Sequence, residues 1–296
     1  MLNERNMRKL LTPKQVARAI GVSEASLKRW CDKGLLQTTR TAGGHRRLPL
    51  DGVIEFIRQT ARPVVQPELL GLPPTSGRTE VVLSRAVPRL REALEAGDAE
   101  RVRAVVFDLH LAGHTLDVIG DKLVAPALAE LGKRWEQGHV EVYQEHRATE
   151  VLLRALYELA AALPAPPETA PVALGATLAG DPYQLALTLA ELTLRQVGWR
   201  AESLGPNHPA ATLCAALRHR RPRLLWLSVS HLRSEAEFVS EYQQVFKAAS
   251  EHRVAVVIGG NALGPQLREQ LRYAAYCDTL SHLVTFAQTL HAPPSA

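Results

Sequence analysis

Residues 11–47 read LTPKQVARAIGVSEASLKRWCDKGLLQTTRTAGGHRR, and they decide the fold of the N-terminal region. Thr12 is a favourable N-cap and Pro13 a favourable first residue, so the sequence predicts a helix that begins there and ends at Gly21. Ser23 predicts the start of a second helix. Two short helices joined by a tight turn with glycine are typical of a helix-turn-helix, whose second helix enters the major groove of DNA.

The positive charge of the chain is concentrated in this region. Residues 1–62 contain 13 Lys and Arg against 5 Asp and Glu, a net charge of +8. The whole chain has 35 against 30, so residues 63–296 carry 22 against 25, a net charge of −3. Contacts with DNA phosphates require such a basic surface. The distribution therefore indicates DNA binding and argues against a merely structural helical domain.

The segment after the second helix carries a family resemblance. Residues 40–47 read R-T-A-G-G-H-R-R and precede a third predicted helix, residues 50–59. This order resembles the MerR-type winged helix-turn-helix, in which arginines of the wing contact the DNA backbone. The resemblance implies binding to double-stranded promoter DNA as a homo-oligomer, a dimer or tetramer. It places Trp30 in the core and implies DNA contacts for Lys28, Arg29, Arg40, His45, Arg46 and Arg47.

Composition narrows the class of protein. Apolar residues make up 46% and charged residues 22%, as in ordinary globular proteins. The apolar runs are strand-sized, far short of the roughly 20 residues needed to span a bilayer, and the N-terminus lacks the apolar core of a signal peptide. The three cysteines show no C-x-x-C spacing, which predicts free thiols rather than zinc ligands. We therefore expect a cytoplasmic protein without a membrane segment.

The sequence pattern divides the chain into three domains and two linkers. Residues 1–61 hold the winged helix-turn-helix, residues 62–79 form a proline-rich linker, and residues 80–164 contain four amphipathic helices that predict a four-helix bundle. Residues 165–171 form a second linker. In residues 172–296 apolar strand-sized runs alternate with helices, which predicts a doubly wound parallel, Rossmann-like domain. The predicted fold class is therefore multidomain, α and α/β.

A spacing in the predicted bundle is typical of one group of sensors. Trp135 is followed after nine residues by Glu145 and His146. This W-x9-E-H pattern resembles the signature of the CarH/LitR-type light-sensing repressors, where the bundle caps the upper face of adenosylcobalamin. The resemblance implies that Trp135 packs on the adenosyl group and that Glu145 and His146 make polar contacts. The alternatives are an ordinary core tryptophan and a surface histidine.

The strand ends of the α/β domain carry a second pattern. Cobalamin-binding domains show the motifs D-x-H-x-x-G, S-x-L and G-G, in this order and at regular separations. Here the chain reads D-P-Y-Q-L-A from Asp181, S-V-S from Ser228 and G-G from Gly259, and the separations agree with that pattern. Residues 80–290 therefore resemble the cobalamin module that is also found in methionine synthase. The resemblance implies cofactor contacts at Asp181, Tyr183, Ser228, Ser230, Gly259 and Gly260.

Both nitrogen ligands of that family are missing. Tyr183 stands where the motif's histidine ligates cobalt, and Glu136 stands where the photoreceptors have a histidine after the tryptophan. A phenol is a poor replacement for imidazole because it must first lose a proton with an ordinary pKa of about 10. Either Tyr183 or His146 could therefore be the metal ligand, and His139 is a further candidate cofactor contact on the bundle.

Three interpretations of the module follow. Adenosylcobalamin binds weakly or with its own benzimidazole on cobalt. Alternatively, the cavity holds another tetrapyrrole, biliverdin or haem. In the third interpretation the module serves only protein–protein contacts.

The expected function is regulatory and not enzymatic, because the sequence contains no catalytic triad, phosphate loop or metal cluster. We expect a DNA-binding transcriptional regulator whose oligomerisation and operator binding are controlled by a tetrapyrrole chromophore, with light as the signal. The alternative is a cobalamin-independent regulator that uses the module for biliverdin, haem or protein contacts.

Overall fold

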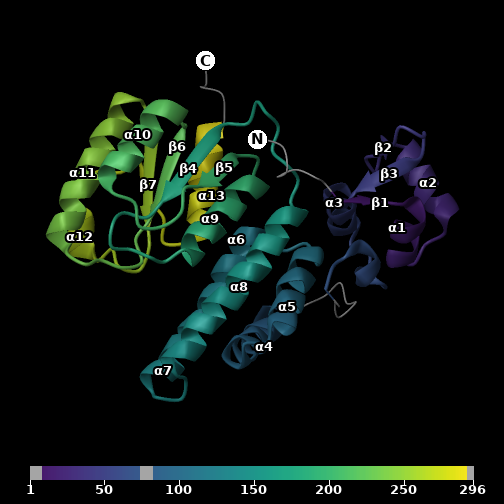
Figure 1. Ribbon diagram of the computed structural model, residues 1–296, viewed down its shortest axis with the longest axis horizontal. Helices are drawn as coiled ribbons and strands as arrows, with labels where there is room; N and C mark the ends of the chain where they lie inside the picture. Colours follow the sequence, from purple (N-terminus) through teal and green to yellow (C-terminus); the bar gives the residue numbers. More distant parts are fainter. Residues whose placement is uncertain (1–8, 74–82, 292–296) are drawn as a thin grey trace. The chain divides into compact units, whose positions relative to one another are not determined.

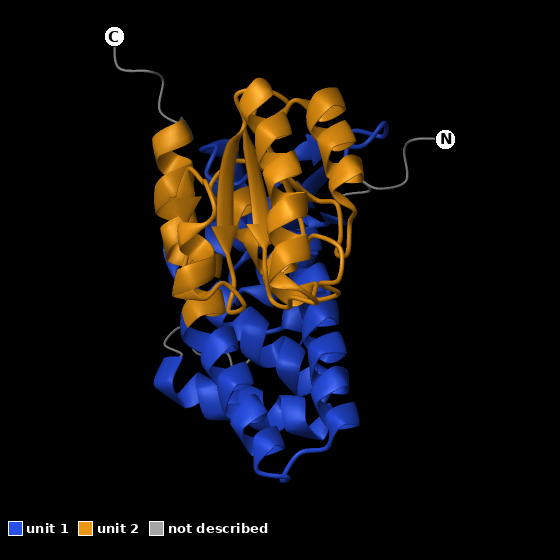
Figure 2. Cartoon of the chain, turned by 90° about the vertical axis from the view of Figure 1, so that its left-hand side faces the viewer, with its two compact units in different colours: residues 1–115, 122–164 blue, residues 116–121, 165–296 orange. Residues whose placement is uncertain are grey.

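The computed structural model describes residues 9–73 and 83–291 of the chain (Figure 1). Its contacts define two compact units (Figure 2). The first unit comprises residues 1–115 and 122–164, and the second comprises residues 116–121 and 165–296.

The first unit begins with a winged helix-turn-helix. Its elements are β1 (Leu10–Leu11), α1 (Pro13–Ala19), α2 (Glu24–Asp32), β2 (Thr39–Arg40), β3 (Arg46–Pro49) and α3 (Leu50–Thr60). Strand β3 pairs antiparallel with β1 on one side and β2 on the other. Thr12 caps α1 in a capping box with Gln15, and Gly21 after the helix has a φ of +66°. The predicted boundaries of this helix are confirmed.

The segment after α3 differs from the linker predicted over residues 62–79. Pro67–Leu70 form a 3₁₀-helix that packs on α1. The backbone N–H groups of Val65 and Gln66 donate to the Ala19 carbonyl at 2.7 and 3.1 Å. Proline composition suggested a linker, but a proline in the first turn of a helix sacrifices no hydrogen bond. The chain therefore stays attached to the helix-turn-helix up to residue 73, and residues 74–79 lie outside the described residues.

The rest of the first unit is helical. It contains α4 (Leu83–Ala96), α5 (Ala99–Leu111), α7 (Ala125–Glu136) and α8 (Val142–Ala162). Helix α4 packs on the other three, and α5 packs on α8. Gly97 and Gly138 separate successive helices, and both adopt the positive φ that favours glycine after a helix.

The helical segment before Gly138 is not continuous. It is divided into the short helix α6 (Leu116–Ile119), a π-helical turn (Gly120–Val124) and α7. Pro126 lies in the first turn of α7. A proline suits the first turn of a helix, so α7 begins here as a new helix instead of continuing the turn before it.

Residues 116–121 belong to the second unit because they make hydrogen bonds to its helices. Asp121 accepts hydrogen bonds from the backbone N–H groups of Leu280 and Ser281 at 2.8 and 3.0 Å, and so caps the start of α13 (Leu280–His291). The N–H of Leu116 donates to Gln196 at 2.7 Å. The predicted bundle of residues 80–164 is therefore interrupted by a segment that packs on the α/β domain.

The second unit has the predicted doubly wound α/β fold. Its parallel strands are β4 (Val172–Ala176), β5 (Arg200–Ser203), β6 (Leu224–Ser228), β7 (Ala255–Gly259) and β8 (Ala275–Tyr276), in the order β5-β4-β6-β7-β8. Its further helices are α9 (Leu185–Gln196), α10 (Ala210–Arg220), α11 (Glu235–Glu251) and α12 (Pro265–Glu269). Helices cover both faces of the sheet (Figure 2), each over its own apolar core.

Strand β6 shows how closely the two cores are packed. Leu225 and Leu227 contribute to one core, and Leu224 and Trp226 to the other. A Cβ atom on Gly175 of the neighbouring strand would overlap the Trp226 ring, so this position requires glycine. None of the described helices combines the length and the apolar character that crossing a membrane requires.

Helix α5 contains a buried histidine. The His110 side chain is 1% exposed, and its Nδ1 has no hydrogen-bond partner among the described residues. Burial, together with the nearby Arg58 guanidinium of α3, lowers the pKa of His110 to about 3. The imidazole is therefore neutral in the folded protein at neutral pH.

We expect this histidine to weaken the fold in mild acid. Below the ordinary imidazole pKa of about 6.5 the unfolded state gains a proton, which the folded state does not bind until the pH nears 3. The unfolding free energy should then fall by at most about 1.4 kcal/mol per pH unit. Urea denaturation between pH 7 and pH 5 measures this slope. H110Q should reduce it and H219Q, on the surface, should not; an unchanged slope in H110Q would contradict the assignment.

Candidate functional site

The predicted recognition helix α2 presents its basic side chains to solvent. Ser23 caps the helix, because its Oγ accepts a hydrogen bond from the Ser26 N–H at 3.1 Å. Leu27 is fully buried and anchors the helix, while the following residues, Lys28 and Arg29, are exposed. Helix α2 therefore has the anchored inner face and basic outer face that groove binding requires.

The predicted wing is the hairpin of β2 and β3. Arg40 lies directly opposite Arg46, and like charges at facing positions destabilise a strand pair. Asp32, at the end of α2, offsets part of the repulsion, since its Oδ1 accepts a hydrogen bond from Arg46 Nη2 at 2.9 Å. Arg40 and His45 are exposed, and Arg46 and Arg47 are half-buried. The wing keeps an excess of positive charge, and sequence patterns did not indicate the role of Asp32.

The prediction that Trp30 belongs to the core is only partly right. Trp30 is half-buried and packs on Phe56 of α3, with ring centroids 5.3 Å apart. The Arg62 guanidinium lies over the indole, 4.4 Å from its centroid. Trp30 therefore joins α2 to α3 at the edge of the core.

Four predicted cofactor residues lie at one end of the bundle. Trp135 ends α7, His139 follows in the turn, and Glu145 and His146 lie near the start of α8, with His146 Nε2 3.6 Å from Glu145 Oε2. Trp135 is 47% exposed, which contradicts the alternative of an ordinary core tryptophan. His146 is exposed, as a surface helix histidine would be.

The same end of the bundle exposes two apolar side chains that no motif had indicated. Val142 and Tyr143, in the first turn of α8, are 51% and 66% exposed. Exposed apolar groups that gather near one another are typical of binding surfaces. Trp135, Val142 and Tyr143, on either side of the α7–α8 turn, are therefore candidates for contact with a ligand or partner.

In the second unit, Asp181 connects two strand-end loops. Its side chain is 3% exposed. Oδ1 accepts a hydrogen bond from the Tyr183 N–H at 3.1 Å, and Oδ2 accepts from the N–H groups of Ser230 and His231 at 2.7 and 3.2 Å. Three backbone donors thus compensate for burial of the carboxylate. Asp181 acts within the protein and fixes the loop after β4 to the loop after β6.

The two loops bring an unpredicted histidine beside Tyr183. Tyr183 is 51% exposed, and its ring centroid lies 6.3 Å from that of His231, with the planes at 58°. His231 is also exposed. It follows the S-V-S motif directly in the sequence, but no spacing rule marks it, because its relation to Tyr183 arises only from the loop contact through Asp181.

The predicted glycine pair meets the protein's own backbone. A Cβ on Gly259 would lie 2.5 Å from the Cys277 carbonyl oxygen, and one on Gly260 would overlap the backbone of Val229. Gly260 also has a φ of +128°, which favours glycine. Packing alone therefore requires glycine at both positions, and the predicted cofactor contacts of Gly259 and Gly260 stay a prediction. Ser228, opposite Gly259, is buried at the end of β6.

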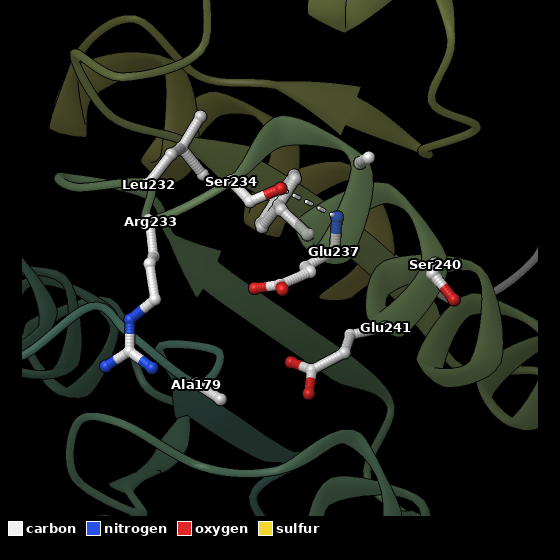
Figure 3. Close-up of a pocket in the computed structure, with 9 residues that line it drawn as sticks. Ala179, Leu232, Arg233, Ser234, Glu237, Ser240 and Glu241 are labelled. Atoms are coloured by element: carbon white, nitrogen blue, oxygen red, sulfur yellow. Dashed lines mark hydrogen bonds between the residues drawn. The ribbon is translucent and has the colours of Figure 1, made fainter.

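A cavity of about 510 Å³ lies beside the same loops (Figure 3). Ala179 comes from the loop after β4, and Arg233, Glu237 and Glu241 come from the loop after β6 and the start of α11. The carboxylates of Glu237 and Glu241 point to the same side, toward the open space bordered by Arg233 (Figure 3). Two carboxylates against one guanidinium leave an acidic lining that disfavours carboxylate ligands and suits amide N–H donors.

Two donor side chains, and no cluster of metal ligands, lie at this edge among the described residues. Throughout residues 9–73 and 83–291, no group of three His, Cys, Asp or Glu side chains is placed to hold a metal. Tyr183 offers a phenol where the motif's histidine is expected, and His231 offers an imidazole on the neighbouring loop.

Known proteins match this architecture. A sequence profile described as a helix-turn-helix domain matches residues 10–61, and one described as a B12 binding domain matches residues 87–160. The chain is 29% identical over 280 residues to the HTH-type transcriptional repressor CarA of Myxococcus xanthus, covering 91% of this chain and 93% of that protein. It is 31% identical over 170 residues to the repressor CarH of the same organism, covering 57% and 56%.

A solved structure shares the fold of the C-terminal part. The monomethylamine corrinoid protein of Methanosarcina barkeri aligns with 71% of this chain and all of its own, with a TM-score of 0.60 and 16% identity. The chain is thus a helix-turn-helix protein with a B12-binding domain. It is similar to the repressors CarA and CarH, to CarA over nearly its whole length. These relatives are transcriptional repressors, in line with the non-enzymatic role that the sequence predicts.

The contacts of Asp181 lead to a prediction about stability. D181A leaves three N–H groups without their acceptor. A single hydrogen bond to a charged group contributes about 1.5–3 kcal/mol, but bonds that share one carboxylate do not add, and water replaces part of them in the variant. We expect a loss of about 2–4 kcal/mol in unfolding free energy, with faster hydrogen exchange at Tyr183, Ser230 and His231. E251A, an exposed carboxylate on α11, is the control. Unchanged exchange at these three amides in D181A would contradict the proposed loop connection.

Proposed function

We propose that this protein is a transcriptional repressor whose oligomeric state and DNA binding are controlled by a corrinoid in its C-terminal module, with light as the signal. The observation that carries the proposal is the presence, in one chain, of a basic winged helix-turn-helix and a B12-binding domain. The repressors CarA and CarH match this chain, CarA over nearly its whole length.

The N-terminal domain supplies the DNA-binding half of the proposal. Lys28 and Arg29 on α2 are exposed and are candidates to reach base edges, Arg29 by giving up or sharing its hydrogen bond to Ser26 Oγ. Arg40, His45 and Arg47 on the wing are suited to phosphate contacts. Arg46 reaches phosphate only by giving up or sharing Asp32. Phosphates would relieve the repulsion between Arg40 and Arg46, so DNA stabilises the wing in its observed pairing.

Charge at the sheet edge supports a corrinoid over the other tetrapyrroles. A corrin ring carries neutral acetamide and propionamide side chains, whereas haem and biliverdin carry two propionates. Glu237 and Glu241 accept hydrogen bonds from amides but repel propionates. Adenosylcobalamin would supply a light-sensitive cobalt–carbon bond. On the bundle, Trp135, Glu145 and His146 are the candidate contacts to its upper face, with His139 nearby.

Control of DNA binding follows from linked equilibria. A ligand shifts an oligomerisation equilibrium only by binding one state more tightly than the other. Oligomers hold several helix-turn-helix domains near one another, so their affinity for repeated sites exceeds that of a monomer by large factors. Loss of the corrinoid, or light, would then release the DNA.

One observation favours a second candidate. Tyr183 in place of the motif's histidine removes the family's cobalt ligand, and a metal-free bilin needs no such ligand. The alternative is therefore a biliverdin-dependent regulator. Haem, with Tyr183 or His146 on iron, and a ligand-free module for protein contacts are further alternatives.

The DNA-binding half predicts a change in salt dependence. R47A and R40A should each weaken binding several-fold and reduce the slope of log K against log salt by about 0.9, the value for one lost phosphate contact. Fluorescence anisotropy with a random-sequence 30-bp duplex measures this. R101A, which removes an exposed arginine of α5, is the matched control. An unchanged slope in both wing variants would exclude the wing from the DNA interface.

The proposed cofactor binding predicts the absorption spectrum of the purified protein and a light-dependent change in the mass of its oligomer. The protein is expressed with adenosylcobalamin, biliverdin or haem in turn. We expect it to retain adenosylcobalamin and to form a larger oligomer in the dark. Green light should dissociate this oligomer and lower the affinity for DNA. Absorption spectra, light scattering and gel shifts measure the three properties. The absorption band of a bilin, or the Soret band of haem, would show that the module binds that cofactor and not a corrinoid. A colourless protein that still binds DNA would leave only the ligand-free interpretation.

A further inference from the structure

The loops that Asp181 connects lie at the switch point of the sheet. In the order β5-β4-β6-β7-β8, the chain proceeds from β4 to one side and from β6 to the other. Ligands of doubly wound sheets bind at the carboxyl ends of the two strands where this reversal occurs. Tyr183 follows β4 and His231 follows β6, so both side chains flank this point.

His231 is held in place through its backbone while its ring stays available. Its N–H donates to Asp181 Oδ2 at 3.2 Å, and the Ser230 N–H donates to the same oxygen at 2.7 Å. The imidazole has no hydrogen-bond partner among the described residues, and the Tyr183 ring borders it on one side. An exposed ring on a fixed backbone is neither a core histidine nor part of an internal hydrogen-bond network.

The other histidines near the carboxyl ends of the strands are less suitable. His208, after β5, is already committed, because its Nε2 lies 2.8 Å from the Leu204 carbonyl oxygen. His282, exposed in the first turn of α13, follows the edge strand β8. Only His231 combines a free imidazole with a place at the switch point among the described residues.

We propose that His231 supplies the nitrogen ligand to the cobalt of a corrinoid bound at this edge, in place of the histidine that Tyr183 replaces. The inference rests on the proposed function. Neutral imidazole nitrogen is a preferred ligand of transition-metal ions, whereas a phenol must first be deprotonated. Asp181 is the positioning residue, and the Tyr183 ring limits the orientations of the imidazole.

Cobinamide is the decisive probe because it lacks the nucleotide base and so brings no nitrogen ligand of its own. Full-length protein is mixed at pH 8 with diaquacobinamide, and binding is measured by co-elution in gel filtration. The absorption spectrum, and nitrogen hyperfine splitting in the electron paramagnetic resonance spectrum after reduction to cobalt(II), report coordination. The variants are H231A, Y183F and the matched control H282A, each checked for native circular dichroism.

The wild type, Y183F and H282A should show the spectral shift and nitrogen splitting. H231A should lose both and bind at least tenfold more weakly, since loss of a supporting group alone typically costs about 10- to 100-fold in metal affinity. Cobinamide that co-elutes with the wild type without nitrogen splitting, or splitting that persists in H231A, would overturn the assignment but leave corrinoid binding intact. No co-elution with any variant, and none of cobalamin, would overturn both proposals.

Discussion

The buried carboxylate of Asp181 is the constraint on which the ligand edge of the α/β unit depends. A buried carboxylate is stable only when it is hydrogen-bonded, and here three backbone N–H groups from two loops supply the bonds. The loops after β4 and β6 therefore cannot move independently without leaving charge or donors unsatisfied. Their side chains, Tyr183 and His231, gain a defined separation as a consequence.

The residues that match the cobalamin motif and the residue that departs from it have different physical roles. Asp181 serves the loop connection, and Gly259 and Gly260 allow close approach to Cys277 and Val229. All three are required whether or not a ligand binds. The motif's histidine is a ligand position with no such packing role, and the exposed Tyr183 stands there. The fold is thus preserved while the coordination chemistry at its edge is free to change.

Charge also constrains the DNA-binding domain, but there the positive charges of the wing are only partly neutralised by carboxylates. Asp32 neutralises Arg46, whereas Arg40 across the hairpin pairs with no carboxylate of the described residues. A domain optimised only for stability would place an acid opposite Arg40. The remaining repulsion is consistent with a surface whose counter-charge is supplied by DNA phosphates. Charge repulsion acts in the same way at the cavity, where Glu237 and Glu241 disfavour ligands that carry carboxylates.

The amino-acid sequence by itself predicted most of the helices and strands and the fold class. Capping by Thr12 and Ser23, the basic segment of residues 1–62 and the alternation of strands and helices depend on local chemistry, which sequence periodicity records. Only the tertiary structure decided that residues 116–121 pack on the α/β domain, that Trp135 is exposed, and that His231 lies beside Tyr183. Each of these depends on contacts between segments far apart in the chain, and no spacing rule encodes which loops a single carboxylate will join.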